Sequence, residues 1–258
     1  MVRSCPLPSW ELGVKQDAGK VLPKANSELQ NQIEKIKKLS DEREMTLNTE
    51  KTCLFIVNFT QKHQFRPLLQ IPGCPTTIDR VLQTKLLGYW LTEDMKTHRH
   101  VQHILAIAYK RIWAIRKLKK AGVSSNDILD FYFMKIRSVL ESNCVVYHSM
   151  LSQEDSSDIE RVQKIVFKII LGPQYTDYHL ACISLNVKQL NLRRIQLCLN
   201  FGLKCLNDHK FKHLFKRNQT TSIRNSDYFY IPTARSTRYY KSPLLYITRL
   251  LNDYFSKS

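Results

Sequence analysis

The sequence predicts a mainly α fold with a small α/β portion near the N-terminus. Helical periodicity dominates from residue 96 to about residue 215, whereas β-rich apolar runs are confined to residues 51–91. With 43% hydrophobic and 10% aromatic residues, the composition is globular. A length of 258 residues fits one or two domains with a real core.

An irregular arm and one helix open the chain. Residues 1–25 mix proline, glycine and polar residues without a sustained period, so no regular element is expected there. Over residues 26–44, leucine and isoleucine recur at intervals of three and four positions among charged residues. This spacing predicts an amphipathic helix whose N-cap is Asn26 or Ser27.

Short strands follow this helix. The compact apolar runs at residues 53–59, 68–71 and 82–91 are typical of strands, and the clearest turn between them covers 71–75. So few strands do not make an independent sheet, and we expect them to pair with a further sheet edge.

Helix start and stop signals divide the rest of the chain. Residues 96–121 form the longest expected helix, which ends at Gly122 in the left-handed C′ position. Ser124 is expected to cap the next helix, and Ser152 a third one that stops at Gly172. Further helices fit residues 178–185, 187–207 and 244–254. The expected organisation is an irregular arm (1–25), an α/β portion (26–95), a helical domain (96–215) and a basic tail (216–258).

The charge balance points to a polyanionic partner. Lys and Arg number 40 against 22 Asp and Glu, which gives a formal net charge of +18. Such an excess attracts nucleic acid or an anionic membrane face, and a merely solvated basic surface is the alternative. The longest apolar stretches, residues 86–91 and 165–171, are far shorter than the roughly 20 residues of a membrane span. No membrane partner is therefore expected.

The N-terminus and the cysteines indicate an intracellular protein. Residues 1–10 lack the apolar region of a secretory signal. The seven cysteines include no C-x-x-C pair and mostly lie in apolar runs, where a thiol packs as a small hydrophobe. We expect free thiols in the core and a nuclear or cytoplasmic location, not secretion.

The expected helix over residues 96–121 carries the strongest functional signal. It holds eight Lys or Arg residues and no acidic residue, whereas an ordinary solvated helix mixes both signs. Such a cationic face suits a phosphate backbone, with Tyr109 and Trp113 as stacking surface; a plain solvated face is the alternative. At 100° per residue, the expected core face comprises Val101, Ile104, Ala108, Ile112 and Ile115. The expected nucleic-acid-binding residues are Arg99, His103, Lys110, Arg116, Lys117 and Lys120.

The sequence contains no recognisable catalytic or metal constellation. The chain has only seven glycines and no G-x-G-x-x-G, P-loop, G-x-S-x-G or Asp-Asp motif. Asp155 and Asp158 suit a helix N-terminus, where acidic residues complement the dipole. The trio His98, His100 and His103 lacks the further ligands of a zinc site. No catalytic residue, metal, cofactor or small-molecule ligand is expected from these patterns.

Two segments of the sequence nevertheless follow each other in a recognisable order. Residues 45–52 have the sequence MTLNTEKT, and residues 85–95 have the sequence KLLGYWLTEDM. The order of segments at 45–52, 85–95, 116–122, 137–141, 158–164 and 169–172 resembles the end of the reverse-transcriptase domain of a non-LTR retrotransposon, LINE-like and of the jockey or CR1 kind. The resemblance covers roughly residues 26–215. It implies membership of the RNA-directed DNA polymerase family, with a partial palm edge (one helix plus short strands) followed by a helical thumb-like bundle and a basic tail.

The resemblance also implies roles for individual residues. Leu47, Asn48 and Thr52 match the palm segment called motif D, and Lys51 matches its lysine near the incoming nucleotide. Leu87, Gly88 and Tyr89 match the primer grip, which places the primer end. Gly88 allows close approach of the backbone to a strand, and Lys51 can meet a triphosphate as a cationic donor.

The sequence departs from this family at the catalytic aspartates. In the family they lie upstream of the helix that here starts near Asn26, yet residues 1–25 contain Asp17 alone. Losing two metal-binding carboxylates removes the Mg²⁺ clamp of nucleotidyl transfer. We therefore expect Mg²⁺ only in a full-length polymerase, and no DNA synthesis by this chain alone.

Two functions remain open at this point. The first is a truncated reverse-transcriptase-like protein that binds the backbone of an RNA/DNA duplex without sequence specificity and loses affinity steeply with salt. The alternative is a helical nucleic-acid-binding or protein-interaction module derived from a retroelement thumb. If residues 96–215 alone fold stably and cooperatively, this result would favour the helical module over the truncated polymerase-like protein.

Overall fold

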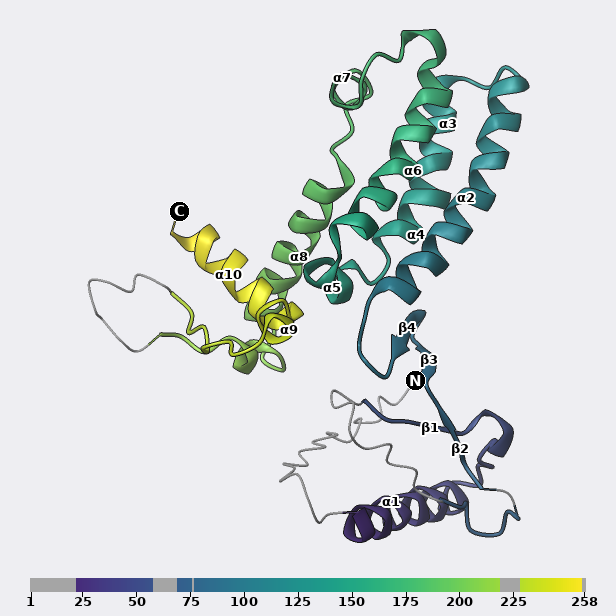
Figure 1. Ribbon diagram of the computed structural model, residues 1–258, viewed down its shortest axis with the longest axis vertical. Coiled ribbons are helices and arrows are strands. Elements are labelled where there is room, and N and C mark those ends of the chain that lie inside the picture. Colours follow the sequence, from purple (N-terminus) through teal and green to yellow (C-terminus); the bar gives the residue numbers. More distant parts are fainter. Residues whose placement is uncertain (1–21, 58–68, 76, 219–227, 257–258) are drawn as a thin grey trace, which may run out of the picture. The chain divides into compact units, whose positions relative to one another are not determined.

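The structure, a computed structural model, describes residues 22–57, 69–75, 77–218 and 228–256. The chain divides into two compact units, Met1–Leu82 and Gln83–Ser258, and each is described by itself. The described chain is mainly helical, with a few short strands in two small sheets (Figure 1). The expected mainly α fold with a small α/β part is confirmed at this level.

The first unit contains one long helix and a parallel pair of strands. α1 (Leu22–Glu42) begins before the expected cap at Asn26 or Ser27. Pro23 accounts for this earlier start, because proline has no N–H to leave unpaired in a first turn and its φ suits a helix. β1 (Cys53–Phe55) pairs in parallel with β2 (Asp79–Val81).

The strand expected over residues 68–71 is not formed by the described residues 69–71. The side chain of Gln30 on α1 instead holds Gln70, donating to its carbonyl at 2.9 Å and accepting from its N–H at 3.1 Å. Gln70 makes only an isolated bridge to Thr77. The expected turn over 71–75 is confirmed, with Gly73 at a φ of 82°. The expected strand over 53–59 ends at Phe55; its residues 58 and 59, residue 68 and the arm to residue 21 lie outside the described residues.

The run expected as a single strand over residues 82–91 is a β-hairpin. β3 (Gln83–Leu86) pairs antiparallel with β4 (Tyr89–Thr92), and the connecting Leu87 and Gly88 have φ angles of 48° and 85°. Positive φ at both central residues is the geometry of a type I′ turn, which Asn and Gly favour. Because leucine gives no turn signal, the sequence pattern did not separate the two strands.

The hairpin belongs to the helical unit, so the units divide at Leu82 and not at the expected boundary of residue 95. Tyr89 is 7% exposed and lies in the same buried cluster as the helices. Its ring centroid is 4.3 Å from that of His100. The burial of one aromatic side chain therefore ties the hairpin to the helices.

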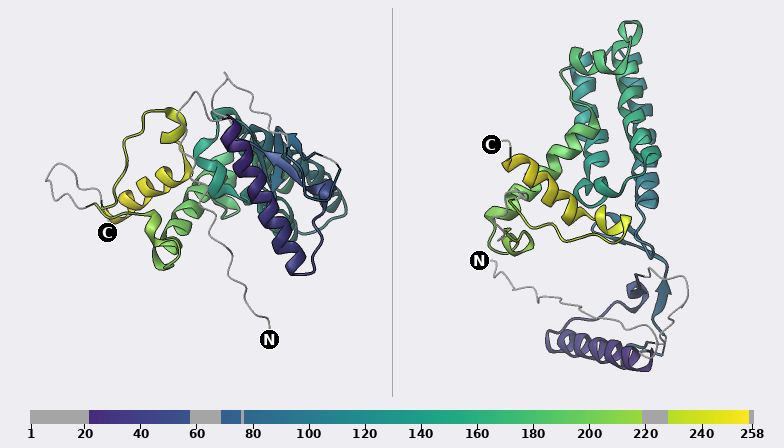
Figure 2. Two further views of the ribbon diagram at one scale, coloured as in Figure 1. Left: turned by 90° about the horizontal axis from the view of Figure 1, so that it is seen from below. Right: turned by 60° about the vertical axis from the view of Figure 1, so that its left-hand side comes forward.

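The helical unit is built around two long helices. α2 (His98–Lys120) and α6 (Gln153–Leu171) lie side by side, flanked by α3 (Ser125–Phe131) and α4 (Ser138–Glu141) (Figure 1, Figure 2). A π-helical turn, Tyr132–Arg137, joins α3 to α4. The remaining helices of this part are α5 (Cys144–Tyr147), α7 (Tyr178–Ser184) and α8 (Leu190–Asn207).

The expected start and stop signals of these helices are confirmed. Ser124 Oγ accepts from the N–H of Asp127 at 3.2 Å, and Ser152 Oγ accepts from the N–H of Asp155 at 3.0 Å. Gly122 follows α2 with a φ of 78°. The serine hydroxyl accepts a hydrogen bond from an otherwise unpaired N–H of the first turn, and this local interaction sets where each helix begins.

The segment expected as a basic tail from residue 216 is partly folded onto α8. It contains α9 (Thr237–Tyr240) and α10 (Pro243–Phe255). Ile247 and Leu251, four positions apart on α10, are buried in a second cluster with Cys198 and Cys205 of α8. The apolar face of α10 outweighs the basic composition of the segment, and residues 219–227 lie outside the described residues.

The expectation of free core thiols holds for most of the described cysteines. Cys144, Cys182, Cys198 and Cys205 are free and buried, and Cys74 is half-buried. Cys53 is exposed, because it stands at the start of a strand in a two-stranded sheet. Cys5 lies outside the described residues.

Candidate nucleic-acid interface

One side of α2 is buried in the core of the helical unit. Val101, Ile104, Ala108, Ile112 and Ile115 are all buried, as the helical spacing predicted. Because an α-helix separates its two faces by half a turn, this burial directs the remaining side chains of α2 toward solvent.

The opposite side of α2 forms a cationic and aromatic stripe. Its members follow one another at intervals of three, four or seven residues and so share one face. This α2 stripe comprises Arg99, His103, Lys110, Trp113 and Lys117. Trp113 is 63% exposed, and the ammonium group of Lys117 lies 5.4 Å from its ring centroid.

The cations at the far end of the stripe are not neutralised by neighbours. Lys110 of the α2 stripe is exposed, as are Arg116 and Lys120 beside the stripe, and none of the three forms an ion pair with a carboxylate in the described part of the chain. An exposed Lys without a partner keeps its charge available for an incoming anion. These side chains, like Lys117 of the α2 stripe, are therefore open to an incoming polyanion.

The hairpin extends the stripe at the start of α2. Lys85 Nζ on β3 lies 3.4 Å from His103 Nε2, and Arg99 Nε donates to Gln83 Oε1 at 3.2 Å. The Arg99 guanidinium also lies 4.8 Å from the ring centroid of Trp90 on β4. Lys85 and Trp90 are cross-strand partners, so the hairpin presents a cation and an aromatic ring side by side.

The sequence reasoning missed Lys85 and Trp90. Both lie in the segment assigned to one strand, where alternate residues point to opposite faces. Only the turn at Leu87 and Gly88 brings them opposite each other. The basic and aromatic residue types were the available signal, but their pairing required the hairpin register.

Positive charge concentrates where the hairpin meets α2. The pKa of His103 is lowered by burial and by the neighbouring charges of Lys85 and Arg99. A third cation is therefore disfavoured at this point unless an anion is present.

Two further basic residues of α2 form hydrogen bonds with backbone carbonyl groups of the fold. Lys119 Nζ donates to the carbonyl of Ile170 at 2.8 Å, and Arg111 donates to the carbonyl of Lys135. These side chains satisfy backbone groups at the ends of neighbouring segments. They are structural, in contrast to the α2 stripe.

The residues matched to motif D form a local turn in the first unit. Asn48 Oδ1 accepts from the N–H of Lys51 at 3.0 Å, and Thr52 Oγ1 donates to the carbonyl of Asn48 at 2.8 Å. Leu47 is half-buried, and Lys51 is exposed. The Asn48 side chain acts as an N-cap of the short 3₁₀ turn Thr49–Lys51, which leaves the Lys51 side chain facing solvent.

The residues matched to the primer grip occupy the hairpin turn of the second unit. Leu87 is 91% exposed at the tip, whereas Tyr89 is buried. Burial raises the pKa of Tyr89 to about 12. Tyr89 therefore anchors the hairpin, and Leu87 and Gly88 are its outward-facing part.

The three histidines of α2 occupy three separate environments. His98 Nδ1 lies 2.8 Å from Asp155 Oδ1, His100 is buried beside Tyr89, and His103 belongs to the α2 stripe. Among the described residues, no group of three or more His, Cys, Asp or Glu side chains is placed to hold a metal ion.

No protein-family model, curated protein or solved structure matches this chain. None of the helices described here combines the length and apolar character needed to cross a membrane.

Proposed function

We propose that the helical unit binds the sugar-phosphate backbone of a nucleic-acid duplex through the α2 stripe, in a reverse-transcriptase-like protein. The observation that carries this proposal is a row of exposed cations without carboxylate partners, interleaved with the exposed Trp113. From Arg99 to Lys117 the stripe extends about 27 Å at a rise of about 1.5 Å per residue. This length faces several consecutive phosphates of one strand, which are spaced by about 3.4 Å along the axis.

The contacts of the stripe favour the backbone over the bases as its target. Straight cationic rows on a helix neutralise phosphates, and such contacts carry no sequence information. At the Arg99 end of the stripe, the hairpin adds Lys85 and the contact between Arg99 and Trp90. This arrangement suits a nucleic-acid strand that passes from α2 onto the hairpin. The resemblance to a retroelement thumb supports an RNA/DNA duplex as the partner.

Removal of two lysines tests the proposal. In the Lys110→Gln, Lys117→Gln double variant, we expect affinity for a labelled RNA/DNA duplex to fall about tenfold at low salt. The slope of log K against log salt should also decrease by about 2, because two counterion-releasing contacts are lost. Fluorescence anisotropy over a range of salt concentrations measures both quantities.

A matched control separates the stripe from total charge. Lys188→Gln with Lys204→Gln removes the same charge from exposed positions of the same unit outside α2. Its affinity and salt slope should stay close to those of the unchanged chain. Equal losses in the two double variants would show that binding follows net charge and not the stripe.

The protein-interaction alternative gives a different result in the same assay. A module that binds a protein through this face would show no duplex affinity that depends on Lys110 and Lys117. Duplexes of unrelated sequence should bind equally if the backbone is the target.

A further inference from the structure

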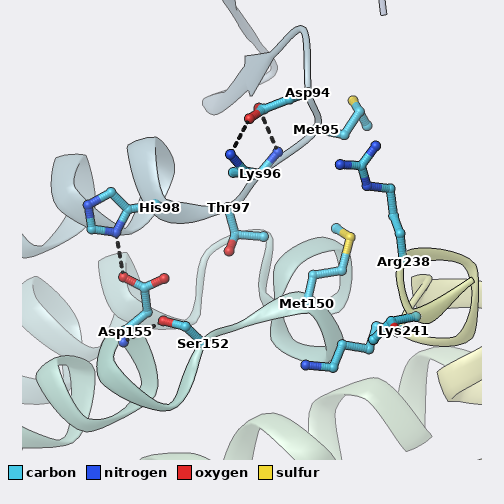
Figure 3. Close-up of a pocket in the computed structure, with 11 residues that line it drawn as sticks. Asp94, Met95, Lys96, Thr97, His98, Met150, Ser152, Asp155, Arg238 and Lys241 are labelled. Carbon is cyan, nitrogen blue, oxygen red and sulfur yellow. Dashed lines mark hydrogen bonds and ion pairs between the residues drawn. The ribbon is translucent and has the colours of Figure 1, made fainter. Parts of the chain in front are cut away.

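A second feature of the helical unit lies outside the α2 stripe. A cavity of about 390 Å³ opens between the start of α2, the start of α6 and the helix α9 (Figure 3). Three chain segments far apart in the sequence form its walls. It is lined by Asp94, Met95, Lys96, Thr97, His98, Met150, Ser152, Asp155, Thr237, Arg238 and Lys241.

The two acidic residues of this cavity are already paired. Asp94 Oδ2 lies 2.9 Å from Lys96 Nζ, and Asp155 Oδ1 lies 2.8 Å from His98 Nδ1. Burial acts to raise the pKa of Asp94, but hydrogen bonds from Lys96 and Thr92 outweigh it and lower the pKa to about 2. The charge of Asp94 is therefore fixed and locally balanced.

The two charged side chains that the end of the chain contributes to the cavity are positive. Arg238 of α9 and Lys241, the residue that follows α9, both line the cavity; in Figure 3 the Arg238 side chain extends toward Met95, and the Lys241 side chain lies below Met150. The Lys241 side chain has no ion pair within the described residues. The first turns of α2 and α6 also meet here; the first turn of α6 carries Glu154 and Asp155, but that of α2 holds no acidic residue, so α2 contributes the positive end of its dipole.

Thr97 provides an independent indication of a ligand. It is only 4% exposed, and its hydroxyl has no hydrogen-bond partner among the described residues. Its backbone angles are helical (φ −86°, ψ −19°), so the side chain does not cap α2 and points into the cavity between Asp155 and Met150 (Figure 3). The hydroxyl oxygen is reached from the cavity, so it can donate its hydrogen bond to a bound acceptor there.

A buried guanidinium adds to the positive potential. Arg194 is 0% exposed and pairs with no carboxylate of the described chain. Its Nη2 donates to Ser156 Oγ at 3.2 Å, in the first turn of α6 and next to Asp155 of the cavity wall. Arg194 does not line the cavity itself, but its charge lies behind the first turn of α6 and adds to the positive potential there.

We propose that this cavity binds a phosphoryl group. A phosphate offers several acceptor oxygens at once, which matches the Thr97 hydroxyl, the Lys241 ammonium and the free N–H groups at the start of α2. The group can belong to free phosphate or to the terminal phosphate of a nucleic-acid strand. This site stands independently of the α2 stripe.

Calorimetric titration of the full chain with inorganic phosphate tests the site. We expect saturable binding of one phosphate per chain. Thr97→Val removes the hydroxyl at nearly constant shape, and Lys241→Gln removes the ammonium; each should weaken phosphate binding at least about fivefold. Lys188→Gln, an exposed residue outside the cavity, should leave the affinity unchanged. Absence of saturable binding, or equal affinity in all these variants, would overturn the proposal.

Competition identifies the source of the phosphoryl group. If it is a strand end, an oligonucleotide with a terminal phosphate displaces inorganic phosphate and its hydroxyl-terminated counterpart does not. If it is free phosphate, the two oligonucleotides compete equally poorly. The Lys110→Gln, Lys117→Gln variant should keep full phosphate affinity in either case, so failure of the α2 stripe and failure of the cavity are distinguishable.

Discussion

His100 shows what burial does to a single titratable residue of this fold. It is 1% exposed, with its ring centroid 4.3 Å from that of Tyr89 and 5.3 Å from that of Tyr147. Neither ring nitrogen makes a hydrogen bond of good geometry within the described chain, although the nearby backbone of Ser142 acts to raise the pKa of the ring. Burial, with the neighbouring positive charges of His103 and Lys85, lowers its pKa from 6.5 to about 4. The imidazole is therefore neutral at neutral pH and packs as an aromatic ring.

This lowered pKa predicts a loss of stability in mild acid. As the pH falls below 6.5, His100 is protonated in the unfolded chain, whereas in the folded chain it is protonated only near pH 4. The free energy of unfolding is therefore highest above pH 6.5 and decreases as the pH falls from 6.5 to about 4. In His100→Phe, which keeps a ring between the two tyrosines, we expect about 2 kcal/mol less loss between pH 7 and pH 4.5. Urea unfolding at both pH values measures the difference.

A half-buried histidine, His148, sets the control for this experiment. Burial and the charge of Arg194 lower the pKa of His148 to about 4 as well, so part of the acid sensitivity should remain in His100→Phe. An unchanged pH dependence in His100→Phe would mean that the imidazole can be protonated in the folded state.

The packing of the helix α10 against the helix α8 depends on one glycine of α8, Gly202. A Cβ atom added at Gly202 would lie 2.6 Å from Ile247 Cγ2 and 3.3 Å from the methyl groups of Leu251. Helix axes approach this closely only when one of the facing residues is small. Gly202 is therefore the position at which the C-terminal helix is seated.

We expect Gly202→Ala to destabilise the helical unit by about 1–3 kcal/mol. Overpacking against Ile247 should outweigh the gain of up to about 1 kcal/mol in helix propensity. Thermal or urea unfolding followed by circular dichroism gives the value. In the background of Ile247→Ala, which removes the closest methyl group, the same substitution should cost less, and a stabilising Gly202→Ala in the unaltered chain would refute this account.

The elements differ in how far their sequences could predict them. Ser124, Ser152 and Gly122 are local signals, and a cap hydroxyl or a left-handed residue acts within its own turn, so those helix ends were predictable. Leu87 occupies a left-handed turn position that its side chain does not favour. Its hairpin forms because Tyr89 is buried in the helical core, and that contact is not local in sequence.

The same distinction holds for the functional surfaces of the whole molecule. The α2 stripe lies on one helix, so periodicity alone placed Arg99, Lys110 and Lys117 on one face. The contribution of Lys85 and Trp90 needed the register of the hairpin. The cavity around Thr97 joins three distant segments, and no pattern in a single segment could predict it.

The limits of the helical unit give a final prediction about folding. Residues 83–258 contain both buried clusters, so this fragment should unfold cooperatively by itself.

A fragment of residues 96–215, the domain expected from the sequence, loses Tyr89 from one cluster and Ile247 and Leu251 from the other. Since burial of each such side chain contributes about 1.5–3 kcal/mol, the shorter fragment should be at least about 3 kcal/mol less stable, or unfolded. Urea titrations of the two fragments followed at 222 nm compare them directly. Equal stability would place the hairpin and α10 outside the cooperative unit, and would favour an independent thumb-derived module over the larger fold.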